Sequence, residues 1–469
     1  MIQGFYQKLG IDFLETFSTT ARTETWHLLL IIAVNKGWPI IQFDVKNAFV
    51  HANIDTDIYT ILPRGLYNNP IYTNKCCYLK KALYSLKQAP RLWNQYFRKV
   101  AKGLGFDILP YDEGVYINKL SKAILIVHVD DILFIHQDKA YIHDIAKKFN
   151  IYIKLEELGD ISTFLGNNIY IDYLAKQIYI DQKDYIYKLL DKFNIYQYRP
   201  IKIPGEPGIR LKKNPYISDK QITSQYQQQI GSLLYASLKT RLDIAFAVNY
   251  CARYMSNPGQ EHIKALEKIW RYLLYKPNLG LSYNCCGDNL YIKGYSDADW
   301  AGDLDSRRST TGYIFSLSSD IGLNNAISWN SQLQKSVALS SCEAEYMAMK
   351  EAIKEAIYLA NIFNYINSQL DLGYLYNIPT ILVDNESAIK LGQNPEFHKK
   401  SKHIDIQYHY IREAIQDNKV KLIYINTKRQ LADLLTKNVN RTLFREFIKL
   451  ANLVDINIST RKIASEPIK

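Results

Sequence analysis

The sequence predicts a mixed α/β protein with α+β character, built from two or three domains. Its 469 residues are more than one domain usually holds. Residues 123–135 read as two buried strands interrupted only by Asp130 and Asp131. From residue 290 onward, strand patterns and helix patterns alternate. Between these regions, residues 196–222 contain four prolines and two glycines, which is typical of a linker.

The apolar run around Asp130 and Asp131 predicts a hairpin with two acids at its tip. Desolvating an unpaired carboxylate is costly, so acids rarely interrupt a buried run for stability alone. Two carboxylates at a strand tip suit a hard cation such as Mg²⁺, which prefers oxygen ligands. An acidic turn in an ordinary hairpin is the alternative interpretation.

The chain carries an excess of positive charge. Lys and Arg total 58 against 46 Asp and Glu, which gives a formal net charge of +12 and a pI of about 9.0. This charge favours a polyanionic partner such as nucleic acid. The cations are scattered along the chain, which predicts grooves lined with charge. The alternative is that the charge serves solubility alone.

Cysteine usage and hydropathy indicate a reducing, intracellular location. The six cysteines include no C-x-x-C motif and no zinc-knuckle spacing, so we expect neither a disulfide framework nor a zinc site. No apolar run reaches the ~18 residues of a membrane span, and the N-terminus lacks a signal-peptide pattern. We therefore expect no membrane partner, and a cytoplasmic particle or the nucleus as the compartment.

The first part of the chain places a third acid on a strand. A helix is predicted over residues 24–36, followed by a strand over residues 40–45 with Asp44 near its end. Together with Asp130 and Asp131, Asp44 would suit two Mg²⁺ ions about 3.5–4 Å apart, an arrangement used in phosphoryl transfer. For Asp44 alone, a solvated acid at a strand end is the alternative.

Four sequence blocks resemble the reverse transcriptase of copia-type LTR retrotransposon polyproteins. Their order and spacing agree over nearly the whole chain. The third block contains Leu-Lys-Gln-Ala-Pro-Arg and is long enough to make a chance match remote. The blocks are residues 10–17 (GIDFLETF), 42–49 (QFDVKNAF), 83–93 (LYSLKQAPRLW) and 129–131 (VDD).

The resemblance implies a right-hand polymerase, with the palm and part of the fingers in residues 1–199. Asp44, Asp130 and Asp131 would be its catalytic, metal-binding triad, with two Mg²⁺ or Mn²⁺ ions as cofactors. Its partners would be an RNA template, a DNA primer and deoxynucleoside triphosphates.

The resemblance also implies contacts to the nucleotide. Phe49 would pack where a ribose 2′-hydroxyl would sit and so favour deoxynucleotides, because leaving a hydroxyl unpaired is costly. Gln88 would contact the incoming nucleotide or the template, and Lys87 and Arg91 would reach phosphate. Plain core packing of Phe49 is compatible with its expected role.

The middle of the chain is predicted to be largely helical. Helices are expected over residues 93–104, 141–150 and 262–275. Residues 164–166 (Phe-Leu-Gly) resemble the family's turn that helps hold the primer end, with a simple β-turn as the alternative. Residues 200–288 resemble the linker, thumb and connection, where basic helices either contact duplex phosphates or simply face solvent. The cations concerned are Arg253, Lys264, Lys268 and Arg271.

Residues 289–440 resemble the ribonuclease H domain of the same polyprotein. The pattern predicts a mixed sheet with a helix beginning near Glu343. The matching blocks are residues 294–303 (GYSDADWAGD), 337–346 (VALSSCEAEY) and 431–437 (LADLLTK). The strands are expected at residues 290–296, 311–317, 326–329, 380–383 and 420–425.

Four acids of this domain, Asp297, Glu345, Asp384 and Asp433, would form a second catalytic and metal-binding set. Glu345 is preferred over Glu343 because the residues four and seven positions after Glu345 share its helix face and are apolar. Four carboxylates at one sheet edge repel one another and need a cation. The resemblance implies two Mg²⁺ ions and cleavage of RNA paired to DNA.

Two features near the C-terminus have weaker signals. His398, His403 or His409 could assist product release or act as a general base, with ordinary surface or capping histidines as the alternative. The tail, residues 441–469, is expected to be peripheral, and residues 459–469 to be disordered.

The chain departs from the family pattern in several places. Met1 corresponds to a position inside the family's polymerase domain. We therefore expect the basic fingers strand to be missing and polymerase activity to be weak. Ser85 replaces a family Gly, His128 a family Tyr and Leu242 a family Pro. The expected function is RNA-directed DNA polymerase plus ribonuclease H acting on RNA–DNA hybrids. The alternative is a decayed fragment that binds nucleic acid with little or no polymerase activity.

Overall fold

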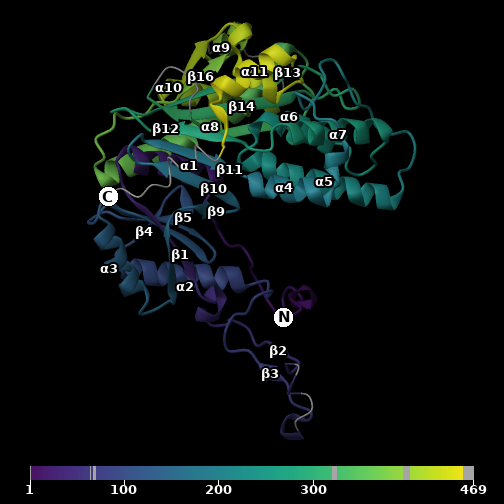
Figure 1. The fold of residues 1–469 in the computed structure, drawn as a ribbon. Coiled ribbons are helices and arrows are strands. Elements are labelled where there is room, and N and C mark those ends of the chain that lie inside the picture. Colours follow the sequence, from purple (N-terminus) through teal and green to yellow (C-terminus); the bar gives the residue numbers. More distant parts are fainter. Residues whose placement is uncertain (1, 64, 67–69, 320–324, 394–401, 458–469) are drawn as a thin grey trace. The chain divides into compact units, whose positions relative to one another are not determined.

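The chain folds into two compact units, shown in a computed structural model (Figure 1). Both units combine sheets with helices, so the predicted α/β class is confirmed. The structure describes residues 2–63, 65–66, 70–319, 325–393 and 402–457. The N-terminal unit holds Met1–Trp26 and Lys36–Ile161, and the C-terminal unit holds His27–Asn35 and Ser162–Lys469.

These units cut across the four segments expected from the sequence. The boundary after Ile161 lies inside the expected segment 1–199. The expected segments 200–288, 289–440 and 441–469 all belong to the C-terminal unit. Strand pairing between distant parts of the chain, described below, explains why these segments stay together.

The N-terminal unit is built on a six-stranded sheet in which all neighbouring strands are antiparallel. Helices α2 (Ala89–Gly103) and α3 (Lys139–Phe149) pack on it, because Phe43 and Phe134 of the sheet share one hydrophobic cluster with Phe97 and other helix residues. In spatial order the strands are β4 (Asp107–Leu109), β5 (Asp112–Asn118), β6 (Ala123–His128), β7 (Asp131–Ile135), β1 (Ile40–Val45) and β8 (Leu155–Asp160). A small separate hairpin consists of β2 (Tyr59–Thr60) and β3 (Cys77–Tyr78).

Helix α1 (Thr23–Asn35) is buried along most of its length. Residues 28–34 are at most 1% exposed. Its sequence shows only an imperfect apolar stripe because a helix that is buried on all sides needs no polar face. In the C-terminal unit, the hydroxyl of Tyr283 lies 3.1 Å from His27 Nδ1, so this buried histidine has a polar partner.

One sheet of the C-terminal unit joins segments that are far apart in the sequence, and all its neighbouring strands are antiparallel. In spatial order its strands are β18 (Leu453–Asp455), β12 (Leu279–Asn284), β11 (Gln177–Asp181), β10 (Asn167–Asp172) and β9 (Thr163–Phe164). The helices of this region are α4 (Lys183–Lys192), α5 (Lys220–Lys239), α6 (Ala245–Ala252) and α7 (Gln260–Tyr275). They share a core that includes Ile230 and Trp270.

The expectation of a peripheral tail after residue 440 is wrong for the residues described up to 457. Helix α11 (Arg441–Leu450) buries Phe444 and Phe447, which are 4% and 1% exposed. These two aromatic residues lie three apart and therefore share one helix face, which explains why the helix packs. Strand β18 then completes the sheet just described. The predicted disorder of residues 459–469 lies outside the described residues.

The second sheet of the C-terminal unit is mixed, as predicted: β13 pairs in parallel with β16, and β16 with β17, whereas the other pairs are antiparallel. In spatial order the strands are β15 (Ala326–Leu333), β14 (Thr310–Ser318), β13 (Tyr291–Asp299), β16 (Thr380–Val383) and β17 (Lys421–Tyr424). The long helix α8 (Ser341–Leu370) packs on β13 and β14. Helices α9 (Glu386–Gln393) and α10 (Lys402–Gln416) pack against α8. No helix in the described part of the chain is both long and apolar enough to cross a bilayer.

Candidate active sites

The first candidate site lies at the end of two paired strands of the N-terminal unit. Strands β1 and β7 are antiparallel, and their register puts Asp44 directly opposite Asp131. The backbone N–H of Val45 donates to the carbonyl of Asp130 at 2.8 Å. All three acids are partly exposed. Folding therefore gathers the three predicted carboxylates at one accessible edge of the sheet.

The acids are carried by a two-residue turn. His128 pairs with Asp131, which leaves Val129 and Asp130 as the loop. Val129 has a φ of +58°, a left-handed conformation that strains a β-branched residue. The indole N–H of Trp93, on α2, donates to the Val129 carbonyl at 2.7 Å. Backbone strain is thus located beside the acids, and a helix side chain helps to maintain it.

The electrostatics of this edge favour a cation. The pKa of Asp131 is raised, first by loss of water around its carboxyl group and then by the negative charges of Asp130 and Asp44. A hydrogen bond from Gln42 Nε2 to Asp131 Oδ1, 3.2 Å long, opposes the shift. A divalent ion with oxygen ligands, such as Mg²⁺, fits this set of donors and would relieve the repulsion.

Phe49 lies in the short helix η2 (Ala48–His51) and is 8% exposed. Its ring packs edge-on against Tyr84, with ring centroids 4.6 Å apart. The pKa of the Tyr84 hydroxyl is raised by burial and by the charges of Asp130 and Asp44, so this tyrosine neighbours the acids. Phe49 is therefore a core residue beside the candidate site, and Tyr84 is a neighbour that the sequence alone did not single out.

The structure gives Gln88 different surroundings from those expected. Its side chain is 0% exposed, its Nε2 donates to the carbonyl of Asp12 at 2.8 Å, and its Oε1 accepts from Gln7 Nε2 at 3.0 Å. Lys87 is exposed, and its Nζ donates to the carbonyl of Gln7 at 3.3 Å. Gln88 thus anchors the N-terminal segment to the start of α2, and contact of either residue with a nucleotide stays a prediction.

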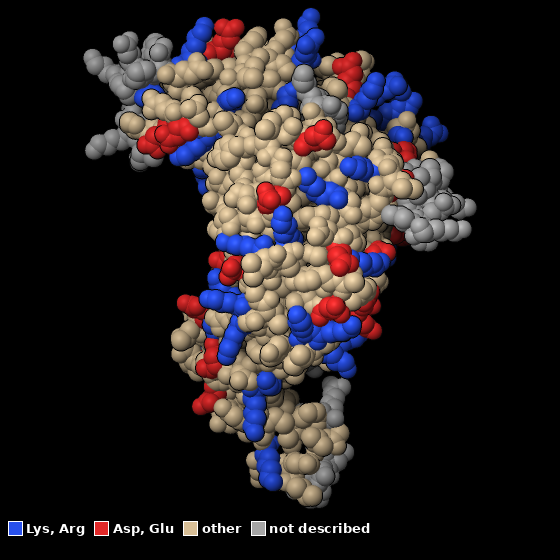
Figure 2. Space-filling model, turned by 90° about the vertical axis from the view of Figure 1, so that its left-hand side faces the viewer, with Lys and Arg blue, Asp and Glu red and all other residues tan. Residues whose placement is uncertain are grey.

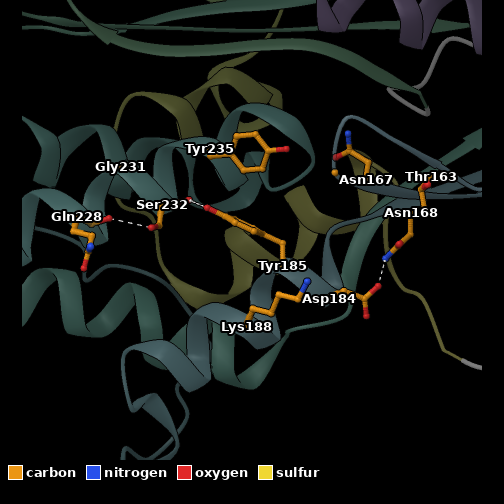
Figure 3. A pocket seen from close by; sticks show the side chains of 11 residues that line it. Thr163, Asn167, Asn168, Asp184, Tyr185, Lys188, Gln228, Gly231, Ser232 and Tyr235 are labelled. Carbon is orange, nitrogen blue, oxygen red and sulfur yellow. Dashed lines mark hydrogen bonds between the residues drawn. The ribbon is translucent and has the colours of Figure 1, made fainter. Parts of the chain in front are cut away.

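The Phe-Leu-Gly turn lies in the C-terminal unit, beside a cavity of about 720 Å³ (Figure 3). Leu165 and Gly166 have φ values of +50° and +74°. The hydroxyl of Tyr235, on α5, donates to the Leu165 carbonyl at 2.8 Å. A Cβ at Gly166 would lie 2.5 Å from the hydroxyl oxygen of Tyr235. Glycine at this position therefore allows α5 to hold the turn. Figure 3 shows the Tyr235 hydroxyl pointing towards this turn, whereas the hydroxyl of Tyr185, on α4, points to Ser232 and donates to its carbonyl at 3.1 Å.

Most of the basic residues expected to contact nucleic acid are paired with acids. Lys264 and Lys87 are the exceptions, because neither forms an ion pair in the described part of the chain. Figure 2 shows Lys and Arg interspersed with Asp and Glu on one face of the molecule, so the net charge of +12 forms no single basic patch there. The pairs are Arg253–Asp303 (3.4 Å), Lys268–Glu206 (2.6 Å), Arg271–Glu267 (3.4 Å) and Arg91–Asp55.

The second candidate site lies at one edge of the mixed sheet in the C-terminal unit. Ser296 of β13 pairs in parallel with Val383 of β16, so the acids that follow them, Asp297 and Asp384, lie side by side. Glu345 comes from the N-terminal part of α8, which packs on β13. Single carboxylate oxygens of Asp297, Glu345 and Asp384 lie within 4.8 Å of one another.

Helix α8 presents Glu345 rather than Glu343 to the sheet, as its apolar spacing predicts. Glu345 is 7% exposed and belongs to the carboxylate cluster. Glu343 instead caps the helix start, since its carboxylate accepts from the Leu339 N–H at 2.7 Å while its own N–H donates to Ser340 Oγ. The two glutamates thus have separate structural roles although they lie only two residues apart.

Burial and mutual repulsion perturb this cluster strongly. Asp297 is 4% exposed, and burial followed by the charge of Asp433 raises its pKa to about 8 against a hydrogen bond from Thr436. Burial and the charges of Asp297 and Asp384 raise the pKa of Glu345 well above its usual range. Glu345 Oε2 is buried without a hydrogen-bond partner in the described structure. An orphaned carboxylate oxygen among other carboxylates is the environment that a divalent cation fits.

The fourth acid, Asp433, lies on the short helix η7 (Leu431–Leu435), which packs on β13 and β14. Its Oδ1 is 2.9 Å from Lys437 Nζ. Thr436 Oγ1 donates to Asp297 Oδ2 at 2.5 Å. The η7 segment therefore contributes an acid, a cation and a hydroxyl to the same cluster.

Sequence reasoning missed three residues that build this site. Thr436 and Lys437 stand three and four residues after Asp433, and the i, i+4 spacing of Asp433 and Lys437 was a usable signal. Gly312 gave no such signal, because its role depends on register: it lies opposite Asp297, and a Cβ there would come 2.8 Å from Thr436 Cγ2. Glycine at 312 therefore lets η7 approach the sheet.

Of the three histidines suggested for the last segment, His409 is the one whose side chain lies in the described part of the chain. His409 is exposed on α10. His398 and the side chain of His403 lie outside the described part of the chain, so the prediction for them is neither supported nor opposed.

Comparison with known proteins identifies the family. Residues 1–207 match the family model described as reverse transcriptase (RNA-dependent DNA polymerase). The chain is 36% identical over 455 residues to the retrovirus-related Pol polyprotein from transposon TNT 1-94 of Nicotiana tabacum, covering 95% of this chain and 33% of the relative. It is 35% identical over 449 residues to the Pol polyprotein from transposon RE1 of Arabidopsis thaliana, covering 95% of this chain and 29% of the relative.

Among solved structures, the foamy viral protease-reverse transcriptase in complex with RNA/DNA hybrid matches with 15% identity and a TM-score of 0.46, covering 87% of this chain and 46% of that one. The chain spans about one third of the length of the curated relatives that it matches. With both relatives aligned over nearly its whole length, the chain belongs to the reverse transcriptase-containing Pol polyproteins of copia-type retrotransposons.

Proposed function

We propose that the C-terminal unit is a ribonuclease H that cuts RNA paired to DNA, and that the N-terminal unit is the catalytic part of an RNA-directed DNA polymerase. The observation that carries the first half is the cluster of Asp297, Glu345 and Asp384, whose oxygens lie within 4.8 Å of one another. Two of these acids are almost fully buried. Such a cluster is unstable when ionised unless a cation is bound, so it is best explained as a metal site.

Asp297, Glu345, Asp384 and Asp433 would together hold two Mg²⁺ or Mn²⁺ ions through carboxylate oxygens. When bound, such a pair activates water and stabilises the leaving oxygen during phosphodiester hydrolysis. The chain's own residues fix the geometry: the parallel register of β13 and β16 sets the spacing of two acids, and α8 adds a third. Lys437 supplies a positive charge at the rim, next to Asp433.

Replacing Glu345 with Gln tests this assignment. The change keeps the size of the side chain but removes its charge. Loss of an outer-shell partner of a metal site typically lowers activity by about 10–100-fold. We expect Glu345→Gln, which alters a proposed direct ligand, to lower Mg²⁺-dependent cleavage of a labelled RNA–DNA hybrid by more than this. The readout is the initial rate of RNA cleavage by the purified chain.

The matched control is Glu343→Gln, on the same helix and two residues away. It makes the same chemical change outside the cluster, and its amide oxygen can still accept from the Leu339 N–H. We expect near wild-type cleavage from this variant. Equal rates for wild type and Glu345→Gln would refute the nuclease assignment.

Polymerisation is the second half of the proposal. It is supported by the direct opposition of Asp44 and Asp131 at the end of β1 and β7, with Asp130 in the adjoining turn. These three acids would hold two Mg²⁺ or Mn²⁺ ions, and Phe49 would limit the space next to the sugar of the incoming deoxynucleoside triphosphate. The substrates would be an RNA template and a DNA primer.

Asp44→Asn should abolish extension of a DNA primer on an RNA template, because it removes one acid of the facing pair. The control is Asp107→Asn, an exposed acid on β4 of the same sheet. Equal extension by wild type and Asp44→Asn would refute the polymerase assignment. Template binding without any extension by the wild type would support the alternative, a nucleic-acid-binding chain with little polymerase activity.

A further inference from the structure

A cavity of about 440 Å³ lies in the C-terminal unit between the linker and two helices. We call it the linker pocket. Its walls come from Gly205 and Arg210 of the linker, Ala247 and Cys251 of α6, Lys264 of α7, and Asn438. We propose that the linker pocket binds one nucleotide unit of the RNA–DNA hybrid, with its phosphate against Arg210 and Lys264. This proposal rests on the nuclease function proposed above.

Three cations and two acids, Glu206 and Glu261, line the linker pocket, and two of the cations are available for an anion. Arg210 and Lys264 are exposed, and neither forms an ion pair or a side-chain hydrogen bond with the described residues of the chain. Lys268 also lines the pocket, but it forms an ion pair, with its Nζ 2.6 Å from Glu206 Oε2. Two cations at one cavity without a directly bonded acid suit a phosphodiester group, whose contacts to proteins come mainly from Lys and Arg.

The floor of the linker pocket suits the less polar part of a nucleotide. Ala247 and Cys251 are 7% and 2% exposed and present small side chains from α6, and Ala265 adds another from α7. Small residues leave room above the helices, and their apolar surface matches the carbon atoms of a sugar ring. A free inorganic anion would leave this part of the cavity unfilled, which favours a nucleotide unit as the occupant.

The linker is fixed in place where it forms the pocket wall. The backbone N–H of Leu211 donates to the Tyr250 hydroxyl at 2.7 Å, and the Tyr254 hydroxyl donates to the Leu211 carbonyl at 2.9 Å. Leu211 itself is 2% exposed. Because both backbone groups of Leu211 are bound by α6 and its C-terminal end, the adjacent Arg210 starts from a fixed backbone. A preorganised cation loses less entropy on binding than one on a free loop.

The linker pocket adjoins the carboxylate cluster. Asn438, in its wall, directly follows Lys437, whose Nζ is 2.9 Å from Asp433 Oδ1. Arg210 is close enough to Asp299 to interact electrostatically with its carboxylate, and Asp299 lies two residues after Asp297 on β13. A Cβ at Gly205 would lie 2.2 Å from Asn438 Oδ1, so glycine lets the linker close against this segment. A hybrid strand that reaches the cluster can therefore place a neighbouring nucleotide in the pocket.

The test is hybrid binding by the double variant Arg210→Gln plus Lys264→Gln. An RNA–DNA hybrid with a fluorescent end is titrated with the full chain in EDTA, which stops metal-dependent cleavage, at several salt concentrations. Loss of one phosphate contact should lower the slope of log K against log salt by about one. We also expect about tenfold weaker binding at low salt. In cleavage assays with Mg²⁺, KM should rise by a similar factor while kcat stays unchanged.

The matched control is Lys354→Gln, an exposed lysine nine residues after Glu345 on α8. Nine residues turn a helix by about two and a half turns, so this lysine faces away from the cluster. We expect it to leave the affinity and the salt slope unchanged. Unchanged binding by the double variant, or equal losses in the double variant and the control, would overturn the proposal.

Binding without cleavage separates this proposal from the nuclease assignment. If Glu345→Gln cleaves like wild type while the double variant binds weakly, the nuclease assignment fails and the linker pocket stands. If Glu345→Gln is inactive while the double variant binds hybrid like wild type, the linker pocket fails and the nuclease assignment stands.

Discussion

Replacing Asp297 with Asn should make the metal-free protein more stable although it removes a proposed metal ligand. Burial and neighbouring charge raise the pKa of Asp297 from 3.8 to about 8 in the folded chain. At pH 7 the folded state therefore keeps a proton that the unfolded state has released. Each pKa unit corresponds to about 1.4 kcal/mol, so about three units between 3.8 and 7 cost about 4 kcal/mol of folding free energy.

The net gain from Asp297→Asn is smaller than this cost. A buried amide without full partners costs about 1–3 kcal/mol, which leaves an expected stabilisation of about 1–3 kcal/mol at pH 7. The pH dependence is a sharper test. The pKa of Asp297 is higher in the folded state than in the unfolded state, so the free energy of unfolding of the wild type decreases as the pH rises from about 4 towards 8.

The assay is hydrogen exchange of β13 and β14 peptides in EDTA and increasing urea, because it reports on the sheet that holds the cluster. The stability difference between Asp297→Asn and wild type should widen by about 1.4 kcal/mol per pH unit from pH 5 to pH 7. Adding Mg²⁺ should reduce this stability difference, because a bound ion stabilises only the wild type. Glu343→Gln should show no such pH dependence. A difference that stays constant with pH, or a variant less stable than wild type at pH 7, would refute the electrostatic reasoning.

Two further predictions concern stability. Ser85→Gly should stabilise the N-terminal unit by about 0.5–1 kcal/mol, because Ser85 has a φ of +80°, which glycine adopts without strain. Thermal unfolding should show a higher midpoint, and a lower one would contradict the prediction. Asp243→Asn should cost about 3–5 kcal/mol, because Arg241 is 0% exposed and its charge is neutralised by Asp243 through hydrogen bonds of 2.8 and 3.0 Å. Urea unfolding measures the loss, and Glu267→Gln in the partly exposed Arg271–Glu267 pair is its control. A loss below about 1 kcal/mol would contradict the assignment of a buried ion pair.

Several parts of the fold could be read from local sequence because local rules govern them. The β6–β7 hairpin and the strands of the mixed sheet follow from β-branched runs bounded by acids and turns. The direction of Glu345 follows from helical periodicity, since its face is decided by neighbours three and four residues away. The helix over α3 was likewise predicted to within two residues at each end.

Other features depended on contacts that local sequence does not encode. Gln88 carries a family motif, but its buried hydrogen bonds to the N-terminal segment appear only when that segment folds back. The chain after residue 440 looked peripheral because the partner of its last strand, β12, lies some 170 residues earlier. The need for glycine at position 312 likewise depends on which strand pairs with which.

Local patterns in the chain were enough to identify the two sets of acids, most of the strands and helices that carry them, and the family. The packing of distant segments was needed to place Asp44 opposite Asp131, to bring Asp297, Glu345 and Asp384 together, and to form a pocket beside them at the linker. The difference lies in how far apart along the chain the interacting residues are. Helix and strand patterns report on residues a few positions apart, whereas strand register, the burial of a charge and the shape of a cavity arise when distant segments pack together.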